Sequence, residues 1–149
     1  MAQPVLQTNY NITVEIGTAY SAGTWTYAPL AEGIENWEFA TNEEIQQYFF
    51  KVDNGFARNH VTGMAPALTV SGRRVFGDAA QDYIMGNIYG LDTDRQSSVK
   101  ITWTAGSTSK GFTCDCTLVD LNDISGDMIE DRPFNVEIRL DGEPQAVGA

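Results

Sequence analysis

Positively charged residues are scarce in this sequence, because nine Lys and Arg stand against twenty Asp and Glu among 149 residues. The formal net charge at pH 7 is −11, and no Lys or Arg occurs before Lys51. Tight binding of duplex DNA depends on clustered cations that neutralise phosphates. The composition therefore excludes a DNA-binding protein of that kind, whereas weak and transient contact with nucleic acid stays open.

Histidine and cysteine, which are common catalytic residues and metal ligands, are nearly absent from the sequence. His60 is the single histidine, and no Ser or Cys motif matches it as a nucleophile. Cys114 and Cys116 would point the same way from one face of a strand, a poor geometry for a mutual disulfide. Two thiols with no cysteine or histidine nearby also fall short of a zinc site. We expect two small buried core residues in a reducing compartment.

Motifs of enzymes and ligand-binding proteins are missing as well. Residues 120–127 are acidic, but Ile124 occupies a ligand position of an EF-hand loop and no Glu stands at the twelfth place. The glycines form neither G-x-G-x-x-G nor a P-loop. Carboxylate pairs such as Glu35/Glu38 are expected by chance in so acidic a chain. The sequence predicts no catalytic, metal-binding or cofactor-binding residue, and therefore a protein that is not an enzyme.

Long hydrophobic runs are absent, so the sequence predicts no membrane span. Residues 1–7 have neither the basic nor the apolar region of a secretory signal. Apolar residues nevertheless make up 42% of the chain, which is enough for a hydrophobic core. We expect one soluble domain over residues 1–149, made in the cytoplasm.

Alternation of apolar and polar residues, the period of a half-buried strand, dominates the chain. Clear examples are residues 12–16, 99–104, 112–118 and 134–140, and weaker ones are residues 45–52 and 61–71. The Asp53-Asn54-Gly55 turn lies between the two weaker stretches, and Pro66 predicts a bulge or a sheet edge in the second. Strands with one buried and one wet face are typical of antiparallel sheets.

One segment has a helical period. Asp78 is a suitable N-cap with Gln81 in the capping-box position, and Gly90 is a suitable terminator. Apolar or small residues recur at helical spacing between them, at Ala80, Tyr83, Ile84, Asn87 and Ile88. Residues 1–10 and 142–149 are polar and lack periodicity, so we expect flexible N-terminal and C-terminal arms. The predicted fold class is mainly β: an antiparallel β-sandwich or barrel with one flanking α-helix.

Six phrases in order carry a resemblance to a known family: GIENW (33–37), VDNGFA (52–57), VTG (61–63), SGRRV (71–75), GDAAQDYI (77–84) and VEIRLDGEP (136–144). Their order and spacing resemble the major tail tube proteins of long-tailed, non-contractile bacteriophages of Gram-positive hosts. The resemblance runs from about residue 33 to residue 144, and residues 1–31 carry little of it.

The resemblance implies a structural protein of the virion tail, assembled in the host cytoplasm. It implies hexameric rings that stack into a hollow tube, with genomic DNA passing through the lumen without tight binding. Its implied partners are copies of itself, a tape-measure protein and tail-end proteins. An acidic lumen suits such a conduit, because it offers no cations to hold phosphates.

Two sets of residues are candidates for these roles. A loop that follows the cation-free first third of the chain is predicted to contact the adjacent ring, and its residues are Lys51, Asp53, Asn54, Gly55, Phe56, Arg58 and His60. Glu35, Glu38 and Glu137 are predicted to face the lumen.

Two other interpretations fit the same sequence. The first is a monomeric β-sandwich binding module, such as an adhesin or a carbohydrate-binding domain, that would use Trp25 and Trp37. The second is a tube subunit of a contractile tail or a secretion system, which shares the architecture. Oligomeric state separates the first of these from a tube protein, because a binding module is expected to remain a monomer.

Overall fold

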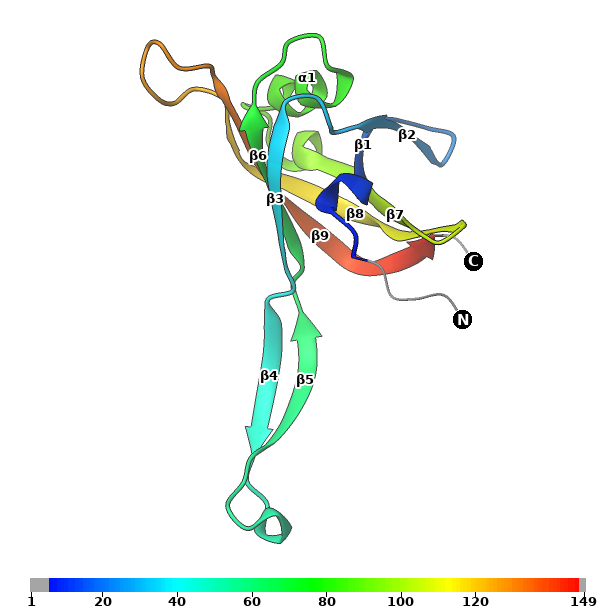
Figure 1. Cartoon of the computed structure of the whole chain (residues 1–149), viewed down its shortest axis with the longest axis vertical. Coiled ribbons are helices and arrows are strands. Elements are labelled where there is room, and N and C mark those ends of the chain that lie inside the picture. Colours follow the sequence, from blue (N-terminus) through cyan, green and yellow to red (C-terminus); the bar gives the residue numbers. More distant parts are fainter. Residues whose placement is uncertain (1–5, 148–149) are drawn as a thin grey trace.

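The computed structural model describes residues 6–147, and nearly half of them lie in one seven-stranded antiparallel sheet (Figure 1). The strand order is β2-β1-β7-β8-β9-β6-β3. The strands are β1 (Thr13–Ser21), β2 (Thr24–Pro29), β3 (Ile34–Ala40), β6 (Ala67–Arg73), β7 (Gln96–Ala105), β8 (Thr108–Asn122) and β9 (Pro133–Val147). The predicted fold class, an antiparallel β fold with one flanking helix, is confirmed.

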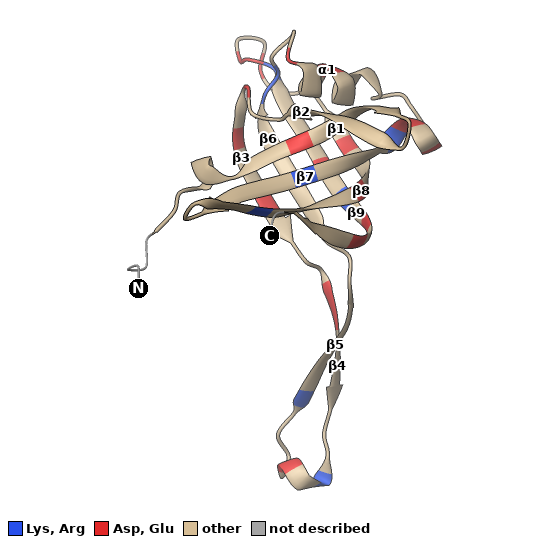
Figure 2. Ribbon diagram, turned by 90° about the vertical axis from the view of Figure 1, so that its right-hand side faces the viewer, with Lys and Arg blue, Asp and Glu red and all other residues tan. Residues whose placement is uncertain are grey.

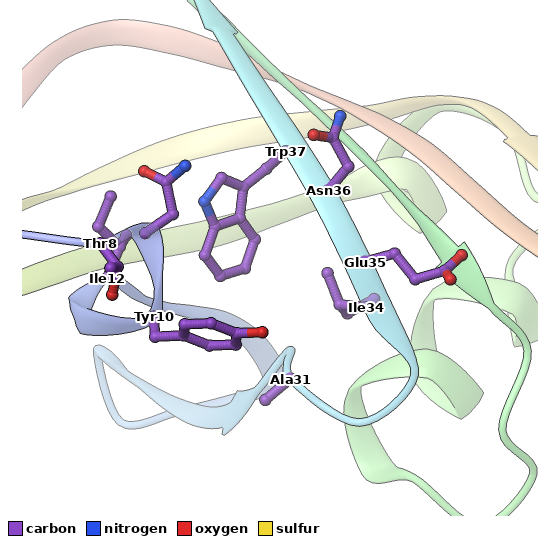
Figure 3. Close-up of a pocket in the computed structure, with 9 residues that line it drawn as sticks. Thr8, Tyr10, Ile12, Ala31, Ile34, Glu35, Asn36 and Trp37 are labelled. Atoms are coloured by element: carbon purple, nitrogen blue, oxygen red, sulfur yellow. The ribbon is translucent and has the colours of Figure 1, made fainter.

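The sheet curls around one hydrophobic core. Alternate residues of the central strands point inward, as the period of two requires, and the largest fully buried side chains include Ile16, Leu118, Phe134 and Ile138. Trp103 is half-buried and packs against this core. The curl brings β3 close to the start of β1, so residues 8–12 and 31–37 line a shared groove (Figure 3). The sheet is therefore an incompletely closed barrel.

The helix α1 (Ala79–Gly86) lies over one end of the barrel (Figure 1). Asp78 is its N-cap, as predicted, because the Asp78 carboxylate accepts a hydrogen bond from the Gln81 backbone N–H at 3.1 Å. The side chain of Gln81 does not complete a capping box. It is buried instead and donates to the carbonyl oxygens of Glu32 and Arg73. The helix ends at Gly86, one turn before the predicted terminator Gly90.

Two strands stand apart from the barrel: β4 (Glu43–Tyr48) and β5 (Arg58–Met64) pair only with each other. Residues 43–64, here called the arm, project away from the barrel at the end opposite α1 (Figures 1 and 2). The predicted strand over residues 45–52 is thus shorter and begins earlier. The predicted strand over residues 61–71 is two strands, because the chain leaves the arm at Ala65-Pro66 and enters β6.

The C-terminal expectation needs a correction. Residues 142–147 belong to β9, and residues 145–147 pair with β8, from Gly111 opposite Val147 to Thr113 opposite Gln145, so this segment is part of the sheet and not a flexible tail. Residues 1–5 and 148–149 lie outside the described residues. Within residues 6–10, the Gln7 side chain donates to the carbonyl oxygen of Thr104, which ties the start of the described chain to β7.

Sequence periodicity did not predict β2 and β3, the two edge strands of the sheet. Both are short, and only one residue of β2 and none of β3 is buried. An edge strand that covers little of the core carries a weak alternation signal. Among the described residues, no helix is long and apolar enough to span a membrane.

Candidate assembly surfaces

The arm exposes an unusual amount of apolar surface. No residue of the arm belongs to the hydrophobic core, and apolar side chains are exposed along its whole length, namely Ile45, Tyr48, Phe49, Phe50, Val52, Phe56, Val61 and Met64. Phe49 is 66% exposed and Phe56 is 76% exposed. An isolated two-stranded hairpin is only marginally stable in water, and large apolar patches mark interaction sites. The arm is therefore a candidate interaction surface.

The arm tip, residues 49–57, has a defined shape. A 3₁₀ turn at Lys51–Asp53 is followed by Asn54 and Gly55, both with positive φ, so the Asn-Gly turn chemistry operates as predicted. Arg58 holds the tip closed, because its guanidinium donates to the Asp53 carboxylate at 2.9 Å and lies 5.3 Å from the centre of the Phe50 ring. The Phe50 ring in turn stacks on Tyr48 at 5.6 Å.

The structure brings all the predicted contact residues together on the arm. Lys51, Asp53, Asn54, Gly55 and Phe56 lie in the tip, and Arg58 and His60 lie on β5. The apolar character of this surface was not predicted from the sequence. The signal was present in Tyr48, Phe50 and Val52, but the alternation over residues 45–52 was interpreted only as that of a half-buried strand.

The predicted lumen residues do not all lie together. Glu38 of β3 is paired with Thr69 of β6, and Thr69 is paired with Glu137 of β9. Directly paired residues point to the same side of a sheet, so Glu38 and Glu137 share the face that points away from the core. Glu35 lies instead at an irregularity between Ile34 and Asn36, where its carboxylate is 3.6 Å from the Arg73 guanidinium.

The face that carries Glu38 and Glu137, here called the outer face, is net acidic. Register and burial place on it five acids and three cations, which are Glu15, Glu38, Asp115, Glu137 and Asp141 against Arg73, Lys100 and Arg139. All three cations have acidic neighbours: Lys100 is paired with Glu15, the Arg139 guanidinium is 3.4 Å from the Glu137 carboxylate, and the Arg73 guanidinium is 3.6 Å from the Glu35 carboxylate. Figure 2 shows a few basic positions among acidic ones on the strands of the barrel.

Two further surfaces are incomplete in the single chain. β2 and β3 each have one edge without a strand partner in the described part of the chain. Unpaired edges are templates for pairing with another chain. Beside β3, the rings of Tyr10 and Trp37 face the same open groove, and the Tyr10 ring is almost fully exposed (Figure 3).

The residues considered for other functions do not converge on a site. Trp25 lies on β2 and Trp37 on β3, at opposite ends of the strand order, and they line different hollows. Residues 6–147 contain no group of three or more His, Cys, Asp or Glu side chains arranged to hold a metal ion. Cys114 and Cys116 are buried and unpaired with each other, as predicted, and burial raises the pKa of both thiols.

Comparison with known proteins finds similarity only in structure. No family model matches the sequence, and no curated protein matches it. A chain from the cap of the anti-feeding prophage, described as the AFP tube terminating cap, is similar with a TM-score of 0.64 at 14% identity, over 100% of this chain and 95% of that chain.

Two further solved structures have similar chains. The tail of an empty GTA particle, with C6 symmetry, gives a TM-score of 0.66 at 9% identity, over 94% of this chain and 98% of that chain. A chain of the sheath-tube complex of the extracellular contractile injection system PVC gives a TM-score of 0.57 at 13% identity, over 94% of this chain and 90% of that chain. The chain therefore has a tail-tube-like fold. These neighbours do not support the narrower assignment to non-contractile phages of Gram-positive hosts.

Proposed function

We propose that this protein is a structural subunit of a phage-like tail tube, in which hexameric rings stack into a hollow conduit. The observation that carries the proposal is the arm, a hairpin with an exposed apolar tip that lies outside the core of its own chain. Apolar surface of this extent is stabilised when it is buried against another molecule. A protein that repeats by stacking provides that partner in every copy.

The remaining surfaces support a ring. The edges of β2 and β3 are open, and neighbouring copies in a closed ring would cover or pair them. Such rings place one face of each subunit toward the axis, and the outer face is the candidate because its charge is net acidic. DNA passing along an acidic wall finds few cations to hold its phosphates, so it slides without tight binding.

In this proposal the protein is a virion tail component that assembles in the host cytoplasm. Copies of the same chain are its main partners, while a tape-measure protein and tail-end proteins complete the tail. Among the similar structures, the injection-system sheath-tube complex makes the tube of a contractile system a second candidate of the same class. The presence of a sheath protein around isolated tubes would distinguish that candidate.

Sedimentation velocity over a concentration series, with electron microscopy of the heavy fraction, tests the proposal. We expect rings or tubes with six-fold symmetry from the intact chain. A matched control replaces residues 43–64 by a short turn between Thr41 and Ala65. These two residues are already close, because the backbone N–H of Ala65 donates to the carbonyl oxygen of Thr41 at 3.0 Å. This control should remain folded and should not stack. A strict monomer from the intact chain at high concentration would contradict the proposal and favour the binding-module interpretation.

A further inference from the structure

A second exposed apolar surface lies at the end of the molecule opposite the arm. The loop between β8 and β9, residues 123–132, is here called the β8–β9 loop, and Figure 1 shows it, in orange, at the same end of the barrel as α1 and away from the arm. Ile124 is 74% exposed, Met128 96% and Ile129 97%. Three such side chains in one short loop are costly to leave in water.

The base of this loop is held firmly. The Arg132 guanidinium donates to both the carboxylate of Asp123, at 2.9 Å, and its carbonyl oxygen, at 3.0 Å. The buried Arg74 side chain lies 3.5 Å from the same carboxylate. Next to Arg132, the carbonyl oxygen of Asp131 accepts a hydrogen bond from the Arg73 guanidinium at 3.0 Å. The loop therefore presents its apolar side chains from a fixed position on the barrel.

The charges of the two ends are complementary. The exposed part of the β8–β9 loop carries Asp127, Glu130 and Asp131 and no cation before Arg132. At the arm tip Arg58 is paired with Asp53 at 2.9 Å, which leaves Lys51 as the unpaired cation of the tip within the described part of the chain. The acids Glu43 and Glu44 lie at the far end of the arm, beside the barrel. Opposite charges around an apolar contact fix the register of two partners and exclude wrong pairings.

We propose that the β8–β9 loop receives the arm tip of a second copy of this chain. This inference rests on the proposed function, since it names the surface that each arm contacts in the adjacent ring. Within one chain the two surfaces lie at opposite ends and cannot meet. Between copies they form a head-to-tail contact, which repeats without closing and so produces a stack. Phe49, Val52 and Phe56 pack against Ile124, Met128 and Ile129, and Lys51 lies near the acids of the loop.

Site-directed cross-linking tests this contact directly. Both natural thiols are buried, so cysteines introduced at exposed positions are the accessible ones. Phe56→Cys and Met128→Cys are made in separate preparations, mixed, assembled and treated with a short bismaleimide. We expect a cross-linked dimer of the two variants in the mixture and little from either variant alone. Tyr89→Cys is the matched control, because Tyr89 is equally exposed but lies outside the loop.

The outcomes separate this inference from the proposed function. One outcome would overturn the contact and leave the tube proposal intact. In it, tubes form normally, but Phe56→Cys either links to Tyr89→Cys as readily as to Met128→Cys or links to neither. A mixture that forms no rings or tubes, when the unsubstituted chain also forms none, would overturn both.

Charge exchange provides a second readout without cross-linking. Lys51→Glu and Asp127→Lys should each raise the protein concentration needed for stacking, by about two- to fivefold for each exposed ion pair lost. The two substitutions combined in one chain should restore stacking toward the original value. Additive losses in the combined variant would show that Lys51 and Asp127 do not meet.

Discussion

Glu38 and Glu137 both lie opposite Thr69, one on each side of β6, and this places two carboxylates on the same face of the sheet although 98 residues of chain lie between them. Neither has a cation directly opposite in the register. Only Arg139, two residues from Glu137 on the same strand, comes near, at 3.4 Å. The pair therefore contributes to the acidity of the outer face, which the proposed function directs toward the lumen.

Reversal of these charges should make the tube retain DNA. Glu38→Lys or Glu137→Lys adds a cation to the outer face, and each added cation is a further phosphate contact that weakens as salt increases. Retention of short DNA by assembled tubes, measured at low and moderate salt, checks this. Glu35→Lys should have a smaller effect, because Glu35 lies beside Arg73 off the regular register. Glu32→Lys, outside the sheet, is the control, and equal retention by all variants would contradict a lumenal outer face.

Gln81 should be important for stability although it is polar. Its side chain donates to the carbonyl oxygens of Glu32 and Arg73 at 2.7 and 3.0 Å and accepts from the backbone N–H of Val75 at 2.8 Å. Gln81→Leu leaves these groups without their partner, and each unsatisfied buried group costs about 1–3 kcal/mol. We expect a loss of roughly 3 kcal/mol in the free energy of unfolding, measured by urea denaturation.

The neighbouring N-cap provides the comparison. Asp78→Ala should cost only about 1 kcal/mol, and Asp78→Ser should recover most of this. An equal or smaller loss of unfolding free energy in Gln81→Leu than in Asp78→Ala would contradict this. It would show that the hydrogen bonds of Gln81 do not hold residue 32 against the start of the helix.

Two glycines should respond in opposite directions to alanine. A Cβ at Gly72 would overlap the carbonyl oxygen of Gly33, so Gly72→Ala forces β3 and β6 apart and should destabilise the protein strongly. Gly86 has open space around its Cβ position and ends α1, so Gly86→Ala should stabilise by about 0.5–1 kcal/mol. Thermal unfolding of the two variants measures both effects, and a stabilised Gly72→Ala protein would refute the close strand approach.

The thiols should be unreactive in the folded protein. Burial raises the pKa of Cys116 and, to a smaller extent, of Cys114, so little thiolate forms at pH 8. A chromogenic disulfide reagent should react slowly with the native protein and rapidly after denaturation. Since the unfolded thiols ionise first, the free energy of unfolding should fall as the pH rises above about 8.5. The double variant Cys114→Ala/Cys116→Ala should show a weaker decline over that range.

Sequence periodicity predicted the central strands well, because residues such as Ile16, Val99, Leu118 and Ile138 are buried on one face and alternate with polar neighbours. The same rule failed for Tyr48, Phe50 and Val52. The alternation over residues 45–52 was interpreted as that of a half-buried strand, but this segment leaves the barrel as part of the arm and exposes all three side chains. A local pattern records that a side chain is apolar, and it does not record whether its partner belongs to the same chain or to another.

The sequence by itself determined the antiparallel β character, the start of the single helix at Asp78, the turn at Asn54-Gly55 and the acidity of the molecule. Each of these depends on neighbouring residues or on composition. Only the tertiary structure decided that residues 142–147 complete β9, that Glu38 and Glu137 share a face, and that the arm and the β8–β9 loop lie at opposite ends. These features depend on strand order and register between distant segments, which arise when the whole sheet closes around its core.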